Sequence, residues 1–270
     1  MNNFFLIVTT TGLALVIFAL YKIAIKLRQF FWNINVQLKD IHNQIFQSEK
    51  HINQLSADIE TKATETQNAI YLSQLDFRIP IFMGGWSIDT FLGKYLIQYI
   101  VNEKPKTILE LGSGSSTLII AKILQLINLE NNTHIAVDHE EKYLNITREY
   151  ARLNGLEDFV SLLACPLINY EEYGKLWYGG LIEQLKETKI DLLVIDGPPG
   201  PLQTNSRFPA LPCLYSYLNE NCVIILDDAN REDEKSIAKK WVEIYPEFSL
   251  HFILEGHGLA LLTRNKNESS

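Results

Sequence analysis

Residues 107–117 read Thr-Ile-Leu-Glu-Leu-Gly-Ser-Gly-Ser-Ser-Thr, and this stretch decides the fold. Thr107–Leu111 has the apolar, β-branched character of a strand, and Ser115–Ile127 has the pattern of a helix. Gly112 and Gly114 lie between them. Glycines let a backbone pass close to a ligand, and the start of a helix offers unpaired N–H groups. We therefore predict a strand, a ligand-binding turn and a helix in succession.

Short apolar runs alternate with longer amphipathic ones from about Leu75 onward. This alternation is typical of an α/β fold with a parallel sheet. Further strands are expected at His134–Asp138, Phe159–Leu163, Ile190–Asp196, Cys222–Leu226, Ser249–Leu254 and Gly258–Thr263. Helices are expected after the second strand up to Leu153, near Leu211–Leu218 and over Glu232–Ile244. The short EGHG link before the last strand predicts an antiparallel hairpin, where a plain dinucleotide-binding fold would continue with parallel crossovers.

The residues around the turn indicate which ligand it binds. A pyrophosphate-binding turn carries a third glycine, and this sequence has Thr117 in its place. Glu110, two positions before Gly112, can receive a cationic amino group, and Asp138, at the end of the second strand, can accept both ribose hydroxyls. A ligand with a ribose, an ammonium group and no phosphate is S-adenosylmethionine. The alternative is that both carboxylates only cap the ends of strands.

Four segments, ILELGSGSST, the acidic end of HIAVD, IDLLVIDGPPG and VIILDDA, resemble the ordered motifs of class I S-adenosylmethionine-dependent methyltransferases. The resemblance runs from about Phe82 to Arg264. In detail it is to a little-characterised group with a GGW segment before the first strand, here Gly84-Gly85-Trp86-Ser87. It implies a Rossmann-like α/β fold whose seven-stranded sheet has the order 3-2-1-4-5-7-6 and an antiparallel last strand.

The same resemblance assigns the residues that bind the methyl donor. The donor's methionine part would lie against Glu110, Gly112, Ser113 and Gly114, with Ser115 beside them at the start of the helix. The ribose would lie against Asp138, and Ala164, after the third strand, would lie near the adenine. These are the predicted cofactor-binding residues.

Carboxylates at two strand ends are the candidates for the chemistry. Asp196 ends the fourth predicted strand, and Asp227 and Asp228 follow the fifth. The carboxyl ends of parallel strands face one crevice, which is where ligands bind. Methyl transfer from a sulfonium is an in-line displacement, and an oxygen acceptor also needs a base or a metal that removes its proton. The predicted catalytic residues are Asp196, Asp227 and His139, the residue after Asp138.

Asp196, Asp227 and Asp228 together also form a predicted metal site, because hard cations such as Mg²⁺ or Ca²⁺ prefer oxygen ligands. More distantly, the arrangement resembles catechol O-methyltransferase and its relatives, in which acidic residues at these strand ends hold a divalent metal. The sequence departs from that pattern, with Asp228 in place of an asparagine and Pro199 in place of a lysine base. The alternative is carboxylates that position the acceptor or the donor's amine directly.

Several other residues allow two interpretations. Trp177 and Tyr178 line an acceptor pocket or pack in the core. Arg207 meets an anionic acceptor or forms a surface ion pair, and His257 acts as a base or is solvated. The run from Gly197 to Pro201 is a rigid turn or one wall of the acceptor site.

The N-terminal residues 1–25 are predicted to be a transmembrane anchor. Phe4–Tyr21 contains no charged residue, and its 18 positions, at about 1.5 Å each, span roughly the hydrocarbon thickness of a bilayer. A cleaved signal peptide is the alternative, but a basic segment ahead of the apolar run is missing. Lys22, Lys26 and Arg28 follow the apolar run, so the catalytic domain is expected on the cytoplasmic side.

Residues 26–74 are predicted to be a coiled-coil stalk, and residues 75–270 the catalytic domain. Apolar positions in the stalk alternate spacings of four and three, which is the pattern of a coiled-coil seam: Leu27, Phe31, Ile34, Leu38, Ile41, Ile45, Ser48, Ile52, Leu55 and Ile59. The pattern favours a homo-oligomer. A single amphipathic helix lying on the catalytic domain is the alternative.

The composition narrows the function. A net charge of -8 and a pI near 5.3 argue against nucleic acid as a partner, because phosphate binding needs a basic surface. We therefore expect a membrane-anchored S-adenosylmethionine-dependent methyltransferase, acting on an oxygen of a small molecule, a glycan or a lipid-linked acceptor. Two alternatives stay open: an inactive methyltransferase-like scaffold that assembles through its coiled coil, and a nicotinamide-dependent oxidoreductase.

Overall fold

The structure, a computed structural model, describes residues 2–83, 87–128 and 131–265. The predicted GGW segment, Gly84-Gly85-Trp86, lies outside these residues. The chain divides into two compact units, one ending at Ala63 and the other beginning at Thr64. Helix α1 (Asn2–Ser73) forms the whole of the first unit and contributes its last turns to the second, so the predicted anchor and stalk are one continuous helix.

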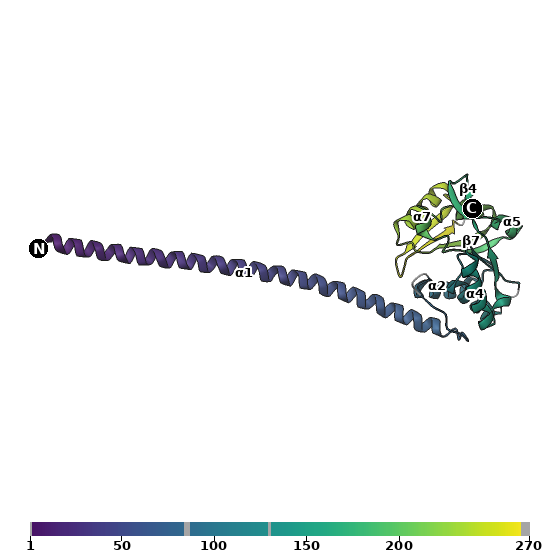
Figure 1. Cartoon of the computed structure of the whole chain (residues 1–270), viewed down its shortest axis with the longest axis horizontal. Helices are drawn as coiled ribbons and strands as arrows, with labels where there is room; N and C mark the ends of the chain where they lie inside the picture. The colour runs from purple at the N-terminus through teal and green to yellow at the C-terminus, as the bar shows by residue number, and fades with distance from the viewer. Residues whose placement is uncertain (1, 84–86, 129–130, 266–270) are drawn as a thin grey trace, which may run out of the picture. The chain divides into compact units, whose positions relative to one another are not determined.

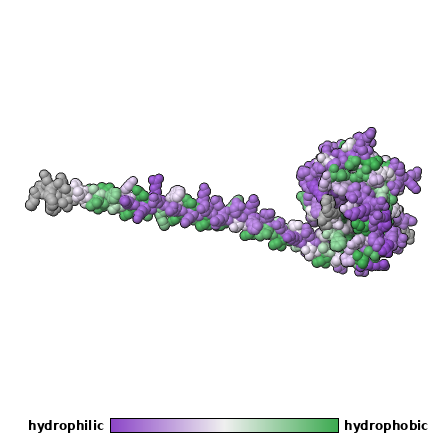
Figure 2. Space-filling view, in the orientation of Figure 1, coloured by the Kyte–Doolittle hydropathy of each residue, from purple (hydrophilic) through white to green (hydrophobic). Residues whose placement is uncertain are grey.

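Helix α1 exposes apolar side chains over much of its length. Leu13, Leu15 and Phe18 are each more than half exposed, and Figure 2 shows hydrophobic residues covering this part of the helix. Among the helices that the structure describes, α1 alone is long and apolar enough to cross a membrane, by length and composition. Its last turns, which belong to the second unit, behave differently, because Asn68 and Leu72 are buried within that unit.

The second unit is built on a seven-stranded sheet, and it confirms the predicted fold. The sheet consists of β1 (Thr107–Leu111), β2 (Thr133–Asp138), β3 (Ser161–Ala164), β6 (Ile190–Ile195), β7 (Leu218–Leu226), β8 (Phe248–Ile253) and β9 (Leu259–Arg264). The strand order is β3-β2-β1-β6-β7-β9-β8, which is the predicted order once the strands of this sheet are numbered along the chain. Strand β9 runs antiparallel to both of its neighbours, as the terminal hairpin required.

Helices cover both faces of this sheet (Figure 1). Helices α2 (Thr90–Glu103) and α3 (Ser115–Ile127) pack on one face, and α4 (Glu141–Asn154) packs beside α3. Helices α5 (Leu181–Leu185), α6 (Ala210–Leu214) and α7 (Glu232–Ile244) pack on the other. Side chains of a strand alternate between its faces. Accordingly Ile108 packs toward α2 and α3, whereas Leu109 packs in the opposite cluster.

Some predicted boundaries shift in the structure. The helix expected near Leu211–Leu218 gives way to a 3₁₀ turn after Leu214, and β7 already begins at Leu218, which pairs with Ile190. Strand β3 begins at Ser161 rather than at Phe159, which lies in another 3₁₀ turn. The structure also contains a two-stranded hairpin that was not predicted, formed by β4 (Leu167–Tyr170) and β5 (Lys175–Tyr178).

Candidate active site

The turn after β1 requires glycine at its first position. Gly112 has φ +99°, a conformation that favours glycine, and its N–H donates to the carbonyl of Val137 in β2. A Cβ on Gly112 would lie 3.1 Å from the backbone carbonyl carbon of Asp196, at the end of β6. Gly114, in contrast, has open space where its Cβ would lie. The turn is therefore closed against the sheet at Gly112 and open toward a ligand at Gly114.

Glu110 lies behind this turn and does not line the cavity, contrary to the predicted contact with the donor. Its carboxylate is fully buried and accepts a 2.7 Å hydrogen bond from the Thr117 hydroxyl, with His134 Nε2 at 3.3 Å. The Thr117 hydroxyl in turn accepts from the Gly114 N–H. The reason is strand alternation: Glu110 is on the same face of β1 as Ile108, the face that α3 covers. Thr117, in the place of the third glycine, thus fixes the turn.

Asp138, at the end of β2, is an ionised carboxylate anchored beside the turn. Its Oδ2 accepts from the Ser113 N–H and hydroxyl at 3.2 and 2.8 Å, and its Oδ1 accepts from the Glu140 N–H at 3.0 Å. Burial alone would raise the pKa of Asp138, but hydrogen bonds from His139, Glu140 and Ser113 outweigh it and lower that pKa. A carboxylate held in this way can accept hydroxyl donors without taking up a proton.

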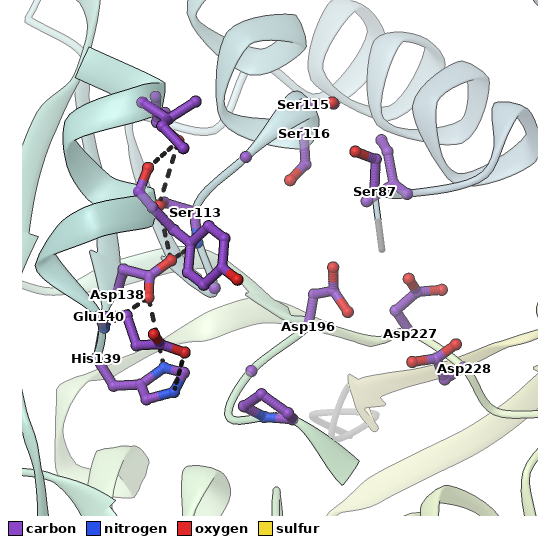
Figure 3. A pocket seen from close by; sticks show the side chains of 18 of the residues that line it. Ser87, Ser113, Ser115, Ser116, Asp138, His139, Glu140, Asp196, Asp227 and Asp228 are labelled. Atoms are coloured by element: carbon purple, nitrogen blue, oxygen red, sulfur yellow. Dashed lines mark hydrogen bonds and ion pairs between the residues drawn. The ribbon is translucent and has the colours of Figure 1, made fainter. Parts of the chain in front are cut away.

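The turn and Asp138 open into one cavity of about 590 Å³. Its lining comes from the turn, α4, the loops after β6 and β7, and the segment before α2: Ile81, Phe82, Ser87, Ile88, Gly112–Ser116, Leu118, Asp138–Glu140, Tyr143, Ile146, Thr147, Tyr150, Tyr178, Asp196, Gly197, Pro199–Pro201, Arg207, Asp227, Asp228, Arg231 and His257. Figure 3 shows Asp138, His139 and Glu140 on one side of this cavity and the three aspartates Asp196, Asp227 and Asp228 on the other.

The three aspartates come together as the strand ends predicted. Each offers a carboxylate oxygen, and these oxygens lie within 4.8 Å of one another. Burial raises the pKa of Asp196 to about 6, with the Arg207 guanidinium lowering it and the Asp228 charge adding to the rise. Burial, with Asp196 and Asp228 adding to it, holds the pKa of Asp227 well above its usual range. The cluster therefore contains carboxylates that take up protons more readily than free aspartate.

Arg207 is the cation at the centre of this cluster and lines the cavity, so it is not the surface ion pair that was one of the two expectations. Its side chain is 3% exposed. The Nη2 group lies 3.0 Å from Asp196 Oδ1 and 2.9 Å from Asp228 Oδ2, and it also donates to the Asp196 carbonyl. The remaining nitrogens donate to the carbonyls of Asp227 and Pro198. Arg207 thereby joins the loops that follow β6 and β7.

The chain resembles known proteins both in sequence and in fold. Residues 109–229 match a family model described as a methyltransferase domain. The second unit therefore contains a methyltransferase domain with the Rossmann-like methyltransferase fold. Its matched segment begins in β1 and ends just beyond β7, so it contains the glycine turn, Asp138 and all three aspartates of the cluster. The comparison with curated protein sequences gave no match.

Solved structures resemble the methyltransferase domain in fold. An S-adenosylhomocysteine-bound methyltransferase, PaMTH1 of Podospora anserina, is 15% identical, with a TM-score of 0.52 over 67% of this chain and 81% of that one. An O-methyltransferase of Bacillus cereus, also with S-adenosylhomocysteine, is 15% identical, with a TM-score of 0.52 over 75% and 91%. The O-methyltransferase TomG of Streptomyces achromogenes, in complex with S-adenosylmethionine, is 11% identical, with a TM-score of 0.51 over 67% and 82%.

The cluster of Asp196, Asp227 and Asp228 is poorly suited to a divalent cation that bridges Asp196 and Asp228. Oxygen ligands surround Mg²⁺ at about 2.0–2.1 Å. The Arg207 Nη2 group, itself positively charged, already lies between Asp196 and Asp228 at hydrogen-bond distance from both. A metal bridging these same oxygens would have to displace the guanidinium. Asp227 Oδ1 is the one buried oxygen of the three aspartates without a hydrogen-bond partner in the described structure.

Two predicted site residues lie away from the reacting centre. Ala164 is exposed at the end of β3 and does not line the cavity, because the chain turns inward only at Cys165, whose N–H donates to the Asp138 carbonyl. His139 does line the cavity, but its nitrogens face Asp138 at 3.4 Å and Glu140 at 3.5 Å. It lies on the Asp138 side, across from the aspartates (Figure 3), which does not favour its predicted role as a catalytic base.

Two further groups shape the cavity: Tyr178, for which the sequence allowed an acceptor pocket or the core, and helix α4, which sequence reasoning did not assign. Tyr178, at the end of the unpredicted hairpin, is fully buried and lines the cavity, and its hydroxyl lies against Gly197, where a Cβ would collide with it. Helix α4 contributes Tyr143 and Ile146, each about half exposed, to the other side of the cavity.

Proposed function

We propose that this chain is an S-adenosylmethionine-dependent O-methyltransferase held at a membrane by α1. The observation that carries the proposal is that one cavity contains both a donor-binding turn and a carboxylate cluster. The open turn at Gly114 and the start of α3 at Ser115 and Ser116 would receive the donor's methionine part, and Asp138 would accept the ribose hydroxyls. With the donor so placed, its sulfonium would face the loops after β6 and β7.

Asp196 is the proposed base. Its side chain is 24% exposed in the cavity, and Oδ1 is held by Arg207, which leaves Oδ2 for an acceptor. As the acceptor oxygen attacks the donor's methyl group, the O–C bond forms and the S–C bond breaks. The hydroxyl proton passes to Asp196, and the sulfonium becomes the neutral thioether S-adenosylhomocysteine. A pKa of about 6 leaves Asp196 mostly ionised at neutral pH and close to the optimum for a general base.

The acceptor class follows from the chemistry of the cavity and from the anchor. The O-methyltransferase neighbours from Bacillus cereus and Streptomyces achromogenes support an oxygen as the methylated atom. The carboxylates and the apolar wall of Ile81 and Phe82 suit a hydroxylated acceptor with an apolar part. A membrane-held enzyme meets lipid-linked acceptors at high effective concentration. We therefore propose a small molecule, a glycan or a lipid-linked intermediate as the acceptor.

The N-terminal helix supplies location and assembly in this proposal. Residues 1–25 would cross the membrane, with Lys22, Lys26 and Arg28 retained on the cytoplasmic side with the catalytic domain. The exposed seam that includes Leu38, Ile41 and other residues of the 26–74 stalk would pair with a second copy. Alkaline extraction should leave the full chain in the membrane fraction, and its release into the supernatant would contradict the anchor.

Calorimetric titration of S-adenosylmethionine into the full chain in detergent tests the donor site. We expect saturable binding, and about a hundredfold weaker binding in Asp138→Ala, as for the loss of two hydrogen bonds to a charged group. Asp158→Ala, a change at an exposed carboxylate outside the cavity, is the matched control and should bind like the wild type. A folded wild type that binds no S-adenosylmethionine would favour the scaffold, and one that binds NADH instead would favour the oxidoreductase.

A further inference from the structure

We propose that Arg207 is the resident cation of the Asp196–Asp227–Asp228 cluster, so that methyl transfer by this chain requires no divalent metal. The inference rests on the proposed O-methyl transfer. It assigns Arg207 as a positioning residue: a fixed charge that orients Asp196 and offsets the repulsion among the three aspartates. A cluster of this kind would otherwise need an ion from solution to bring its carboxylates together.

The placement of the guanidinium favours this assignment. Its Nη2 group bridges Asp196 Oδ1 and Asp228 Oδ2 at 3.0 and 2.9 Å, so one positive group is paired with an aspartate from each of the two strand ends. An arginine carries its charge at every physiological pH, whereas a bound metal depends on supply. The same Asp228 Oδ2 accepts a second cation, Arg231 Nη1, at 2.7 Å. This oxygen is therefore already taken by two built-in charges.

The guanidinium is also locked in place by the backbone. Nη1 donates to the Asp227 carbonyl at 2.9 Å, Nη2 to the Asp196 carbonyl at 2.8 Å, and Nε to the Pro198 carbonyl at 3.4 Å. Glu234 Oε1 lies 3.9 Å from Nη1. A guanidinium has five N–H donors, and these contacts engage all three of its nitrogens. Arg207 is thus held firmly within the cluster.

The competing occupant is a divalent ion on the oxygens that Arg207 leaves unused. Asp227 Oδ1 is buried and has no hydrogen-bond partner in the part of the chain that the structure describes. Asp228 Oδ1 lies 3.8 Å from His257 Nδ1. An ion there would lie close to the positive guanidinium, which lowers its affinity by Coulomb repulsion. The two occupants therefore predict opposite results for metal binding by the unmodified protein.

The experiment is a titration of the full chain in detergent with Mn²⁺, followed by the loss of the free-ion signal in electron paramagnetic resonance. We expect no stoichiometric binding by the wild type, and unchanged methyl transfer in the presence of a chelator. Arg207→Gln should gain a Mn²⁺ site about thirtyfold tighter or more, the effect in water of removing one unit charge about 4 Å from a divalent ion. Arg207→Gln combined with Asp227→Asn should lose that site again.

Other outcomes overturn the inference. One Mn²⁺ bound per wild-type chain and lost in Asp227→Asn would show that the cluster is a metal site in spite of Arg207. Because this measurement uses the unmodified protein, it decides the question even where Arg207→Gln does not fold. Arg207→Lys keeps the charge without the planar fork, so it should lower kcat while the KM for S-adenosylmethionine stays the same. A failure of the donor titration would refute the proposed function and leave the Mn²⁺ result intact.

Discussion

We predict that the environment of Asp196 produces an acid limb in the pH–rate profile. Burial raises the pKa of this carboxyl group to about 6, against the lowering effect of Arg207. A general base must be ionised to accept a proton, so kcat/KM should fall as the pH drops through that value. Between pH 7 and pH 5 the ionised fraction falls from about 90% to about 10%, which predicts a decrease in rate of nearly tenfold.

Neighbouring charges should move this limb in a predictable direction. The negative charge of Asp228 contributes to the raised pKa of Asp196, so Asp228→Asn should shift the limb to lower pH. Asp196→Asn should remove the limb and lower kcat by about 10²–10⁴-fold, the usual contribution of a general base. Asp158→Asn, which changes an exposed carboxylate outside the cavity, should leave the profile where it is.

The assay is initial-rate transfer of a labelled methyl group from S-adenosylmethionine to the acceptor found by screening, measured from pH 5 to pH 8. Carbon-13 NMR of the aspartate carboxyl groups gives the same pKa without any acceptor. A limb near pH 4 in the wild type would refute the assignment of Asp196 as the base. So would a limb that moves to higher pH in Asp228→Asn, because a lost negative neighbour can only favour ionisation.

Other predictions concern the turn, the histidine and the stalk. Gly112→Ala should lower the free energy of unfolding by about 2 kcal/mol or more, measured by urea denaturation, because the site has positive φ and no room for a Cβ; Gly114→Ala, with open space, should stay within about 0.5 kcal/mol of the wild type. His139→Gln should weaken S-adenosylmethionine binding in calorimetry yet leave kcat within a few-fold, and a loss of turnover as large as that of Asp196→Asn would restore its predicted role as a base. Ile41→Lys should convert an oligomer into a monomer in sedimentation of the detergent-solubilised chain, whereas Asn43→Lys, off the seam, should not; a wild type that is already monomeric would contradict the coiled coil.

The central elements could be predicted from the sequence because their ends are marked by local chemistry. Strand β1 and helix α3 have the predicted bounds, since the Gly112–Gly114 turn separates them. The hairpin of β4 and β5 has no such signal: its strands are four residues each, too short for a periodicity to be recognised. The predicted strand began at Cys222, whereas β7 begins at Leu218. The cause is similar, because polar residues at the beginning of β7 interrupt its apolar run.

The sequence predicts which strand ends form the site, but it does not predict all the contacts that the side chains make there. The meeting of Asp196 with Asp227 follows from parallel strands, and so does the position of Asp138. The inward burial of Arg207 does not follow, because it lies in a loop between β6 and α6 whose path depends on tertiary packing. The orientation of Glu110 could have been predicted from the sequence. Side chains two positions apart in a strand lie on the same face, so Glu110 shares the face of Ile108, which α3 covers.

The two sides of the cavity shift the pKa values of their carboxylates in opposite directions, and this difference supports different roles for Asp138 and Asp196. At Asp138, hydrogen bonds from His139, Glu140 and Ser113 lower the pKa, so the group stays charged and can only accept hydrogen bonds. At Asp196, burial raises the pKa to about 6, so the group can take up and release a proton near neutral pH. Titratable groups whose environments push their pKa values apart within one site are suited to different tasks. In the proposed mechanism, the donor's ribose would therefore lie at the charged Asp138, and Asp196 would take up the acceptor's proton.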